Sequence, residues 1–284
     1  MTVKIAQKLG GVSETLLMTL YARARESQRP DAMIRDDLAV QMVQQIDCDF
    51  SRLKMQRHDE VAIVMRMRKF DDHARGFFAR NPEGVVVHIG CGLDTRFERV
   101  DNGRVEWFDL DMPDVIALRK DLLNEDSGRY HMLASSVFDE GWMAEVSCLE
   151  PRRFMFLAEG VFPYFEESQI RELFLSVRDR FPGCEVVCDA HTPFVIWADN
   201  LQLAVSGVQA RLHWRLKDPR DVEKWGQGIR LLDEWNYYED DEPRLKSVRW
   251  ARQYPHSRNL RAFSTISWGR FNFFPAVRSP GPYP

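Results

Sequence analysis

The chain has 284 residues, 44% of them hydrophobic, and a formal net charge of −4, which argues against a general nucleic-acid-binding protein. Its length suits one large α/β domain with additions better than two equal domains. The five cysteines are scattered without CxxC spacing and no stretch approaches the ~20 apolar residues of a membrane span, so we expect a cytoplasmic protein without a metal site or membrane contact.

The first part of the chain has the pattern of helices. Leu17, Leu20 and Ala24 recur at the spacing of one helix face. A second apolar face ends just before Pro82, where a helix is expected to stop. These helices precede every predicted strand, so we expect an N-terminal helical cap over residues 1–82.

Beyond the cap, over residues 83–284, strands and helices alternate. Four runs are short and apolar, as expected of strands buried on both faces of a sheet: 85–89, 105–110, 154–158 and 185–190. Apolar residues at helical spacing follow the second and third runs, and Pro113 sits where the first of these helices can begin. Alternation of this kind indicates right-handed βαβ crossovers and a doubly wound α/β sheet.

The last third of the sequence is less regular. Residues 194–215 are predicted to be mostly helical, and two further strands are expected at 229–238 and 262–270. The second of these strands, AFSTISWGRF, is rich in β-branched and aromatic residues.

The strongest candidate site is the turn that follows the first buried strand. Gly90 and Gly92 allow a sharp bend there and let a flat ligand approach the backbone. Such a GxG pattern is common in loops and is weak alone. Asp111 lies nineteen residues beyond Gly92 at the end of the second strand, where a carboxylate can bind a ribose diol. Asp109 points to the same side of that strand and is the alternative.

Two other kinds of protein could use the same turn and acid. A nicotinamide-dependent oxidoreductase requires Gly or Ala three residues after Gly92, where this chain has Thr95, and no catalytic Tyr/Lys or His/Asp set is recognisable. The other alternative is a protein that binds the cofactor or a partner without catalysis.

Three separated motifs narrow these alternatives: HIGCGLDTR, WFDLDMPDVIALRK and LAEGVFPYF, preceded by TLYARARESQRPDAMIRDDLA. With them the sequence resembles the leucine carboxyl methyltransferase family, in particular its bacterial branch of polyketide-type, tetracenomycin-like O-methyltransferases. The resemblance implies a class I methyltransferase fold, which is Rossmann-like, with a mostly parallel seven-stranded sheet, helices on both faces and an antiparallel last strand. It also implies S-adenosyl-L-methionine as methyl donor and S-adenosyl-L-homocysteine as product.

The resemblance further implies where the donor binds. Gly90 and Gly92 would form the loop under the methionine part of the cofactor, and Asp111 would bind the ribose hydroxyls. Arg66 matches an arginine on the cofactor carboxylate, with Arg68 as the alternative. The full implied set of cofactor-binding residues is Arg35, Arg66, Gly90, Gly92, Asp111, Ser136, Val137 and Glu159.

Three members of this set need a separate reason. Arg35 matches a basic position that the family brings from the cap to the cofactor. Ser136 and Val137 stand where the family has an acidic residue and a leucine at the adenine, so this contact departs from the pattern. Glu159 follows a strand at the sheet edge where α/β folds bind ligands; it either faces the cationic sulfonium or forms a structural ion pair.

On the acceptor side, the candidates are Tyr164 and His191. Tyr164 matches a tyrosine near the acceptor in the family, and packing is its alternative role. His191 could orient or deprotonate a hydroxyl, although a lone histidine is more often structural. Methyl transfer to a carboxylate needs no base, which agrees with the lack of a dyad, so we expect a small-molecule carboxylate acceptor of the polyketide or another secondary-metabolite type. Residues of about 191–228 would form a substrate-specificity insertion.

Charge near the end of the chain favours an anionic acceptor or simple local pairing. An acidic run at 239–242 is followed by basic residues spread over 244–278. Pairing of the two runs on a solvated face is the plainer interpretation.

Overall fold

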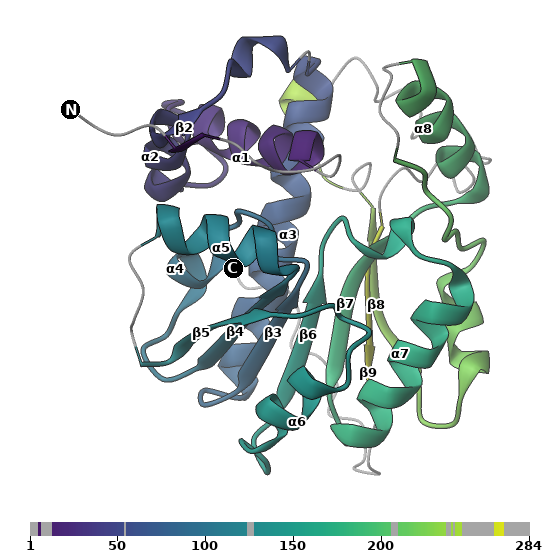
Figure 1. Ribbon diagram of the computed structural model, residues 1–284. Coiled ribbons are helices and arrows are strands. Elements are labelled where there is room, and N and C mark those ends of the chain that lie inside the picture. Colours follow the sequence, from purple (N-terminus) through teal and green to yellow (C-terminus); the bar gives the residue numbers. More distant parts are fainter. Residues whose placement is uncertain are drawn as a thin grey trace.

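The computed structural model of the protein describes residues 5–6, 13–53, 55–123, 128–205, 210–236, 240, 242–245 and 264–269. A twisted sheet forms its centre, with helices on both faces and the N-terminal helices over one end of the strands (Figure 1). No helix in this described part of the chain is long and apolar enough to cross a membrane.

The main sheet combines parallel and antiparallel pairing. Its strands are β3 (Val85–Ile89), β4 (Glu106–Asp111), β5 (Tyr130–Ala134), β6 (Phe154–Ala158), β7 (Glu185–Ala190), β8 (Arg230–Asn236) and β9 (Ser264–Gly269). They are hydrogen-bonded in the order β5-β4-β3-β6-β7-β9-β8. The parallel part comprises the first five strands of this order, and β9 runs antiparallel to both β7 and β8. The expected α/β class, the parallel sheet and the antiparallel last strand are confirmed.

Helices fill both faces of the sheet and one of its ends. They are α1 (Ser13–Ser27), α2 (Asp37–Gln45), α3 (Arg57–Arg80), α4 (Arg96–Val100), α5 (Pro113–Leu122), α6 (Gly141–Ser147), α7 (Glu167–Arg180) and α8 (Pro193–Val205). Short 3-10 turns are η1 (Phe50–Arg52), η2 (Phe162–Tyr164) and η3 (Pro219–Trp225). A separate two-stranded sheet pairs β1 (Ile5–Ala6) with β2 (Ile46–Asp47).

Strand β3 shows how the sequence places the layers. All five of its residues are buried, as expected of a central parallel strand. Val86 belongs to the same buried cluster as Phe70 and Phe77 of α3, whereas Val87 belongs to the cluster that contains Phe174 of α7. The alternation of side chains along the strand therefore assigns α3 and α7 to opposite faces.

The first two helices cover the turn after β3. Leu17 and Leu20 of α1 and Met42 of α2 share a buried cluster with Leu93, which lies in that turn, and with Leu118 of α5. Helix α3, by contrast, packs on the sheet itself. The division of the chain at residue 82 stays a prediction.

The expectation that residues 194–215 are mostly helical is confirmed for the first part of this range and wrong for its last part. Helix α8 ends at Val205, and residues 210–216 have no regular structure. Hydrogen bonds to other elements hold this segment: the Asn200 side chain bonds both the N–H and the C=O of Leu212, and the N–H of Trp214 donates to the carbonyl of Pro163. Its apolar residues Leu212, Trp214 and Leu216 are buried without forming a helix, which periodicity alone did not reveal.

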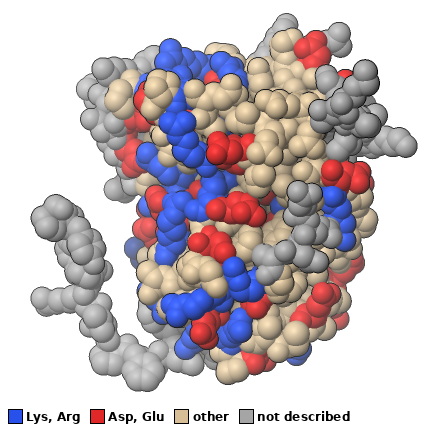
Figure 2. Space-filling model, turned by 90° about the vertical axis from the view of Figure 1, so that its left-hand side faces the viewer, with Lys and Arg blue, Asp and Glu red and all other residues tan. Residues whose placement is uncertain are grey.

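Surface charge in the described residues is mixed. The face in Figure 2 carries Lys and Arg interspersed with Asp and Glu. Of the basic run near the end of the chain, Arg244 pairs locally with Glu242 at 2.8 Å and with Glu26 of α1 at 3.1 Å. The other members of that run all lie outside the described residues. The cysteines are free, as expected.

Candidate functional site

The glycine turn begins directly after β3 and needs glycine for two reasons. Gly90 has a φ of 61° and Gly92 a φ of 52°, values that side-chain-bearing residues rarely adopt. A Cβ atom on Gly90 would also lie 2.3 Å from Cγ2 of Val161. The turn is joined to β4 by the N–H of Gly90, which donates to the carbonyl of Leu110 at 2.7 Å.

The carboxylate of Asp111 lies against this turn. Its Oδ2 accepts from the N–H of Gly92 and its Oδ1 accepts from the N–H of Met112, both at 2.7 Å. Burial raises the pKa of Asp111. The turn and the acid, which sequence reasoning placed at neighbouring strand ends, are thus in direct contact.

The alternative acid, Asp109, lies inside the protein. It is 2% exposed and accepts from the Arg119 guanidinium, from the Tyr130 hydroxyl at 2.5 Å and from Trp107 Nε1 at 2.8 Å. Burial works to raise the pKa of Asp109, but the charge of Arg119 and the contacts with His88 and Tyr130 together outweigh it, and the pKa is lowered. Its lone pairs are used by the core, which leaves Asp111 as the acid at the sheet edge. His88 is 2% exposed and is a core residue as expected.

Glu159, at the end of β6, is held by two arginines. Arg66 Nε donates to Oε1 at 2.8 Å, and Arg96 Nη2 donates to Oε2 at 2.6 Å. Arg66 Nη1 also donates to Oδ2 of Asp189 at 2.9 Å, and Oδ1 of Asp189 accepts from the N–H of Gly160 at 2.9 Å. One helix, α3, therefore ties the ends of β6 and β7 together through Arg66.

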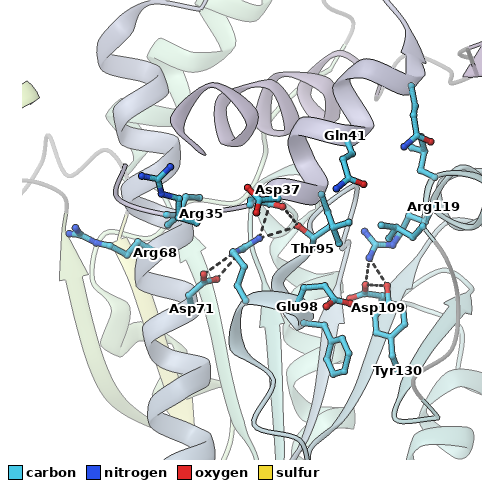
Figure 3. Close-up of a pocket in the computed structure, with 18 of the residues that line it drawn as sticks. Arg35, Asp37, Gln41, Arg68, Asp71, Thr95, Glu98, Asp109, Arg119 and Tyr130 are labelled. Carbon is cyan, nitrogen blue, oxygen red and sulfur yellow. Dashed lines mark hydrogen bonds and ion pairs between the residues drawn. The ribbon is translucent and has the colours of Figure 1, made fainter. Parts of the chain in front are cut away.

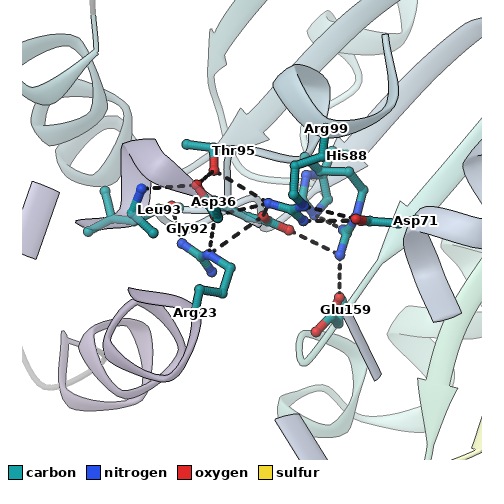
Figure 4. A network of polar contacts seen from close by, with 12 residues as sticks. Arg23, Asp36, Asp71, His88, Gly92, Leu93, Thr95, Arg99 and Glu159 are labelled. Atoms are coloured by element: carbon teal, nitrogen blue, oxygen red, sulfur yellow. Dashed lines mark hydrogen bonds and ion pairs between the residues drawn. The ribbon is translucent and has the colours of Figure 1, made fainter. Parts of the chain in front are cut away.

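A buried network around Arg96 was not identified from the sequence; Figure 4 shows this network, with Asp71, Arg99 and Glu159 among its labelled members. The side chain of Arg96 is fully buried and pairs with Asp71 at 2.7 Å, with Asp94 at 3.1 Å and with Glu159. Burial works to raise the pKa of Asp71 and of Asp94, but the neighbouring arginines outweigh it and both pKa values are lowered. The available signal was the position of Arg96 inside the motif HIGCGLDTR, directly after the turn.

The side chains of Arg35 and Arg68 contact other parts of the molecule than the glycine turn. Arg35 is exposed and donates to the carbonyl of Ser27 at 2.7 Å, and Arg68 pairs with Asp240 at 3.0 Å. Both line a cavity of about 880 Å³ beneath α2 (Figure 3). Among the described residues, the lining of this cavity includes neither Gly90, Asp111 nor Glu159. The structure therefore does not bring Arg35 together with the glycine turn.

Ser136 and Val137 follow β5 and lie beside Asp111. The preceding Ser135 donates its N–H to the carbonyl of Asp111 at 3.0 Å. The N–H of Ser136 donates to Oδ2 of Asp139 at 3.1 Å, and Val137 is buried. This loop thus borders the turn and acid on the β5 side.

The two acceptor-side candidates lie in different surroundings. Tyr164, in η2, is half-buried, and burial raises its pKa. His191 is 4% exposed; its Nδ1 is 3.3 Å from Oδ2 of Asp199 in α8, and its Nε2 is 4.0 Å from Oδ2 of Asp189. Burial works to lower the pKa of His191, but Asp189 and Asp199 outweigh it and the pKa is raised. His191 therefore links Asp199 of α8 to Asp189, which also pairs with Arg66.

Solved structures share this architecture. A candidate methyltransferase from Thermobifida fusca matches with a TM-score of 0.53 and 14% identity, covering 88% of this chain and 93% of that one. A DUF574 family protein from Streptomyces avermitilis matches with a TM-score of 0.55 and 12% identity, covering 88% and 97%. Together with the sheet order, these likenesses define the α/β methyltransferase fold.

Sequence relatives give the family. Residues 16–178 match the profile of the leucine carboxyl methyltransferases. The tetracenomycin polyketide synthesis O-methyltransferase TcmP of Streptomyces glaucescens is 36% identical over 85% of this chain and 88% of its own length. The S-adenosyl-L-methionine-dependent methyltransferase dpfgK of Gibberella zeae is 29% identical over 85% and 87%. The chain belongs to the leucine carboxyl methyltransferase family and is an S-adenosylmethionine-dependent methyltransferase.

Proposed function

We propose that the protein methylates an oxygen, in particular a carboxylate, on an anionic small-molecule acceptor of the polyketide or another secondary-metabolite type. The observation that carries the donor half of this proposal is the contact between Gly92 and Asp111 at the carboxyl end of the parallel strands, which is where open α/β sheets bind ligands. The similarity to a polyketide O-methyltransferase supports the acceptor half.

In this proposal the donor lies along the turn. Gly90 and Gly92 border its methionine part, and the loop with Ser136 and Val137 borders its adenine. Each oxygen of Asp111 accepts one backbone N–H, and a carboxylate oxygen has two lone-pair directions. The carboxylate can therefore accept the ribose hydroxyls as well.

Arg66 is the proposed contact for the donor carboxylate, and Glu159 acts through it. Both oxygens of Glu159 already accept from arginines. Gly160, which follows Glu159, has a φ of 71°, a value that residues with a Cβ rarely adopt. Glu159 is thus proposed to fix Arg66 in place rather than to neutralise the sulfonium directly. Arg35, which donates to the carbonyl of Ser27 in this structure, remains a proposed cofactor contact.

The chemistry asks little of the protein beyond alignment. S-adenosylmethionine, when bound, supplies a methyl group on an already activated sulfonium. The chain must hold the nucleophile in line and exclude water. A carboxylate is ionised at neutral pH and needs no base. The raised pKa of His191 between two aspartates favours its charged form, which suits attraction of an anion better than proton removal from a hydroxyl.

Acceptor recognition is assigned to residues of about 191–228 and to Tyr164. The first of these residues, His191, contacts Asp199 of α8, so α8 is linked to the charged group at the strand ends. Residues 213–216 are tied to Pro163 and His191 by backbone hydrogen bonds. This segment therefore lies against residues that follow β6 and β7.

Two measurements test the proposal. Calorimetry should detect S-adenosylhomocysteine binding and no binding of NAD; the reverse would make the protein an oxidoreductase. Small-molecule extracts incubated with methyl-tritiated donor should then yield a labelled product that releases volatile methanol in mild alkali, because carboxyl methyl esters hydrolyse there. Label that resists alkali would exclude a carboxylate acceptor, and donor binding without any labelled product would indicate a non-catalytic member.

A further inference from the structure

A buried group of four side chains joins the first two helices to the donor turn. We infer that Arg23 and Asp36 are positioning residues for donor binding, which hold the turn after Gly92 in the conformation that the donor requires. We call this group the clamp: Arg23, Asp36, Thr95 and Arg99. The inference rests on the proposed donor site at this turn.

Arg23 reaches from α1 to the turn. Its side chain is 1% exposed, and its Nε donates to Oδ2 of Asp36 at 2.8 Å. Its Nη2 donates to the carbonyl of Leu93 at 2.5 Å. Because a guanidinium presents several donors in a rigid plane, one side chain fixes both the acid before α2 and a peptide group of the turn.

Asp36 serves four elements with one carboxylate. Its Oδ1 accepts from the N–H of Ala39, which caps α2, at 2.9 Å and from the Thr95 hydroxyl at 2.7 Å. Its Oδ2 accepts from Arg23 and from Nη1 of Arg99 in α4 at 3.1 Å. The two oxygens therefore have different tasks: Oδ1 caps a helix and holds Thr95, and Oδ2 holds two arginines.

The turn is gripped from two sides. From the core, Nη1 of Arg119 donates to the carbonyls of Gly92 and Asp94 at 2.7 and 2.8 Å. From the cap, Arg23 holds the carbonyl of Leu93, which lies between them. Loss of the cap contact frees the peptide next to Gly92, whose N–H meets Asp111. Loss of this contact should therefore lower the affinity for the donor and leave acceptor binding unchanged, since the acceptor-side residues are on other elements.

The variant Asp36→Asn separates the two tasks. The amide oxygen can still accept from Ala39 and Thr95, while the amide N–H₂ meets the donors of Arg23 and Arg99. We expect the dissociation constant of S-adenosylhomocysteine to rise about tenfold or more, as for loss of a charge-assisted hydrogen bond, with the acceptor KM within about twofold. Asp37→Asn is the matched control, because this neighbouring acid is exposed and the charge change is the same.

Hydrogen exchange gives a second readout. Amides of the turn, residues 90–95, should exchange faster in Asp36→Asn than in the wild type, with β6 and β7 unchanged. If Asp36→Asn does not fold, Thr95→Val tests the other contact between Asp36 and the turn, since it removes the hydroxyl that donates to Oδ1 at nearly constant size; it should also weaken donor binding. The variant Arg23→Lys has a single ammonium group, which cannot contact both Asp36 and the carbonyl of Leu93. Its affinity for S-adenosylhomocysteine should therefore fall as in Asp36→Asn.

The outcomes keep this inference apart from the proposed function. Wild-type protein that binds no S-adenosylhomocysteine would overturn the donor site itself. Wild-type binding with unchanged affinity in Asp36→Asn, Arg23→Lys and Thr95→Val would overturn only the positioning role, and a lowered melting temperature alone would make the clamp purely structural.

Discussion

Among single residues, Asp111 should dominate donor affinity. Asp111→Asn keeps the size of the side chain but removes the negative charge that would accept the ribose hydroxyls. We expect binding of S-adenosylhomocysteine to weaken by about 1.5–3 kcal/mol in calorimetry. Asp114→Asn, an exposed acid in the first turn of α5, is the control. Equal affinity in both variants would remove Asp111 from the site.

Arg96 should matter first for stability. Arg96→Met leaves the buried carboxylates Asp71, Asp94 and Glu159 without a shared cation. Breaking a buried ion pair from one side costs about 3–5 kcal/mol, which urea unfolding can measure. Arg104→Met, at an exposed position, should change little. A loss below about 1 kcal/mol in Arg96→Met would contradict the network.

Residues differ in how far the sequence alone identifies them. Gly90, Gly92 and Asp111 could be singled out because each stands at a strand end whose position the apolar runs reveal. Arg96 could not be assigned, because its partners come from α3, the turn and β6, and only the folded chain brings them together. Arg35 shows the reverse case: its motif matched, but the direction of its side chain depends on how α1 and α2 meet. The roles of these site residues stay predictions.

At the level of elements, the turn after β3 should tolerate no side chain at Gly90. Gly90→Ala combines a positive φ with a Cβ 2.3 Å from Val161 Cγ2, so we expect a stability loss of about 2–5 kcal/mol and weaker donor binding. Gly103→Ala also has a positive φ, with nothing within 4 Å, and should lose only about 1–2 kcal/mol. Urea unfolding compares them; equal losses would mean that Val161 moves aside.

Most of the predictable strands were buried on both faces. Strands β3, β6 and β7 appear as continuous apolar runs because helices cover both of their faces. Strand β5 was missed, since it lies at the sheet edge and four of its five residues are partly or fully exposed. The short helices α4 and α6 have too few turns for a periodic signal.

For the whole molecule, stability should fall in mild acid through His73. Burial, followed by the charge of Lys69, lowers the pKa of His73 to about 4 from 6.5. Below pH 6.5 His73 is protonated in the unfolded chain, whereas in the folded chain it stays neutral down to about pH 4. The free energy of unfolding therefore falls as the pH is lowered through this window. We expect a loss of about 2–3 kcal/mol between pH 7 and 4.5 in urea titrations.

The control for this pH effect is His73→Gln, which cannot titrate. Between pH 7 and 4.5, the free energy of unfolding of His73→Gln should fall by about 2–3 kcal/mol less than that of the wild type. An identical pH dependence in both proteins would show that His73 accepts its proton in the folded state without penalty, and the acid response would then belong to other groups.

The long reach of the clamp has a consequence for biosynthesis. Arg23 meets a carbonyl that lies 70 positions later in the chain, and Asp36 meets a hydroxyl 59 positions later. A ribosome therefore releases α1 and α2 well before their docking partners exist, and the apolar side of Leu17 and Leu20 waits uncovered until Leu93 and Leu118 emerge. During that interval the nascent chain exposes an apolar helical surface of the kind that chaperones bind.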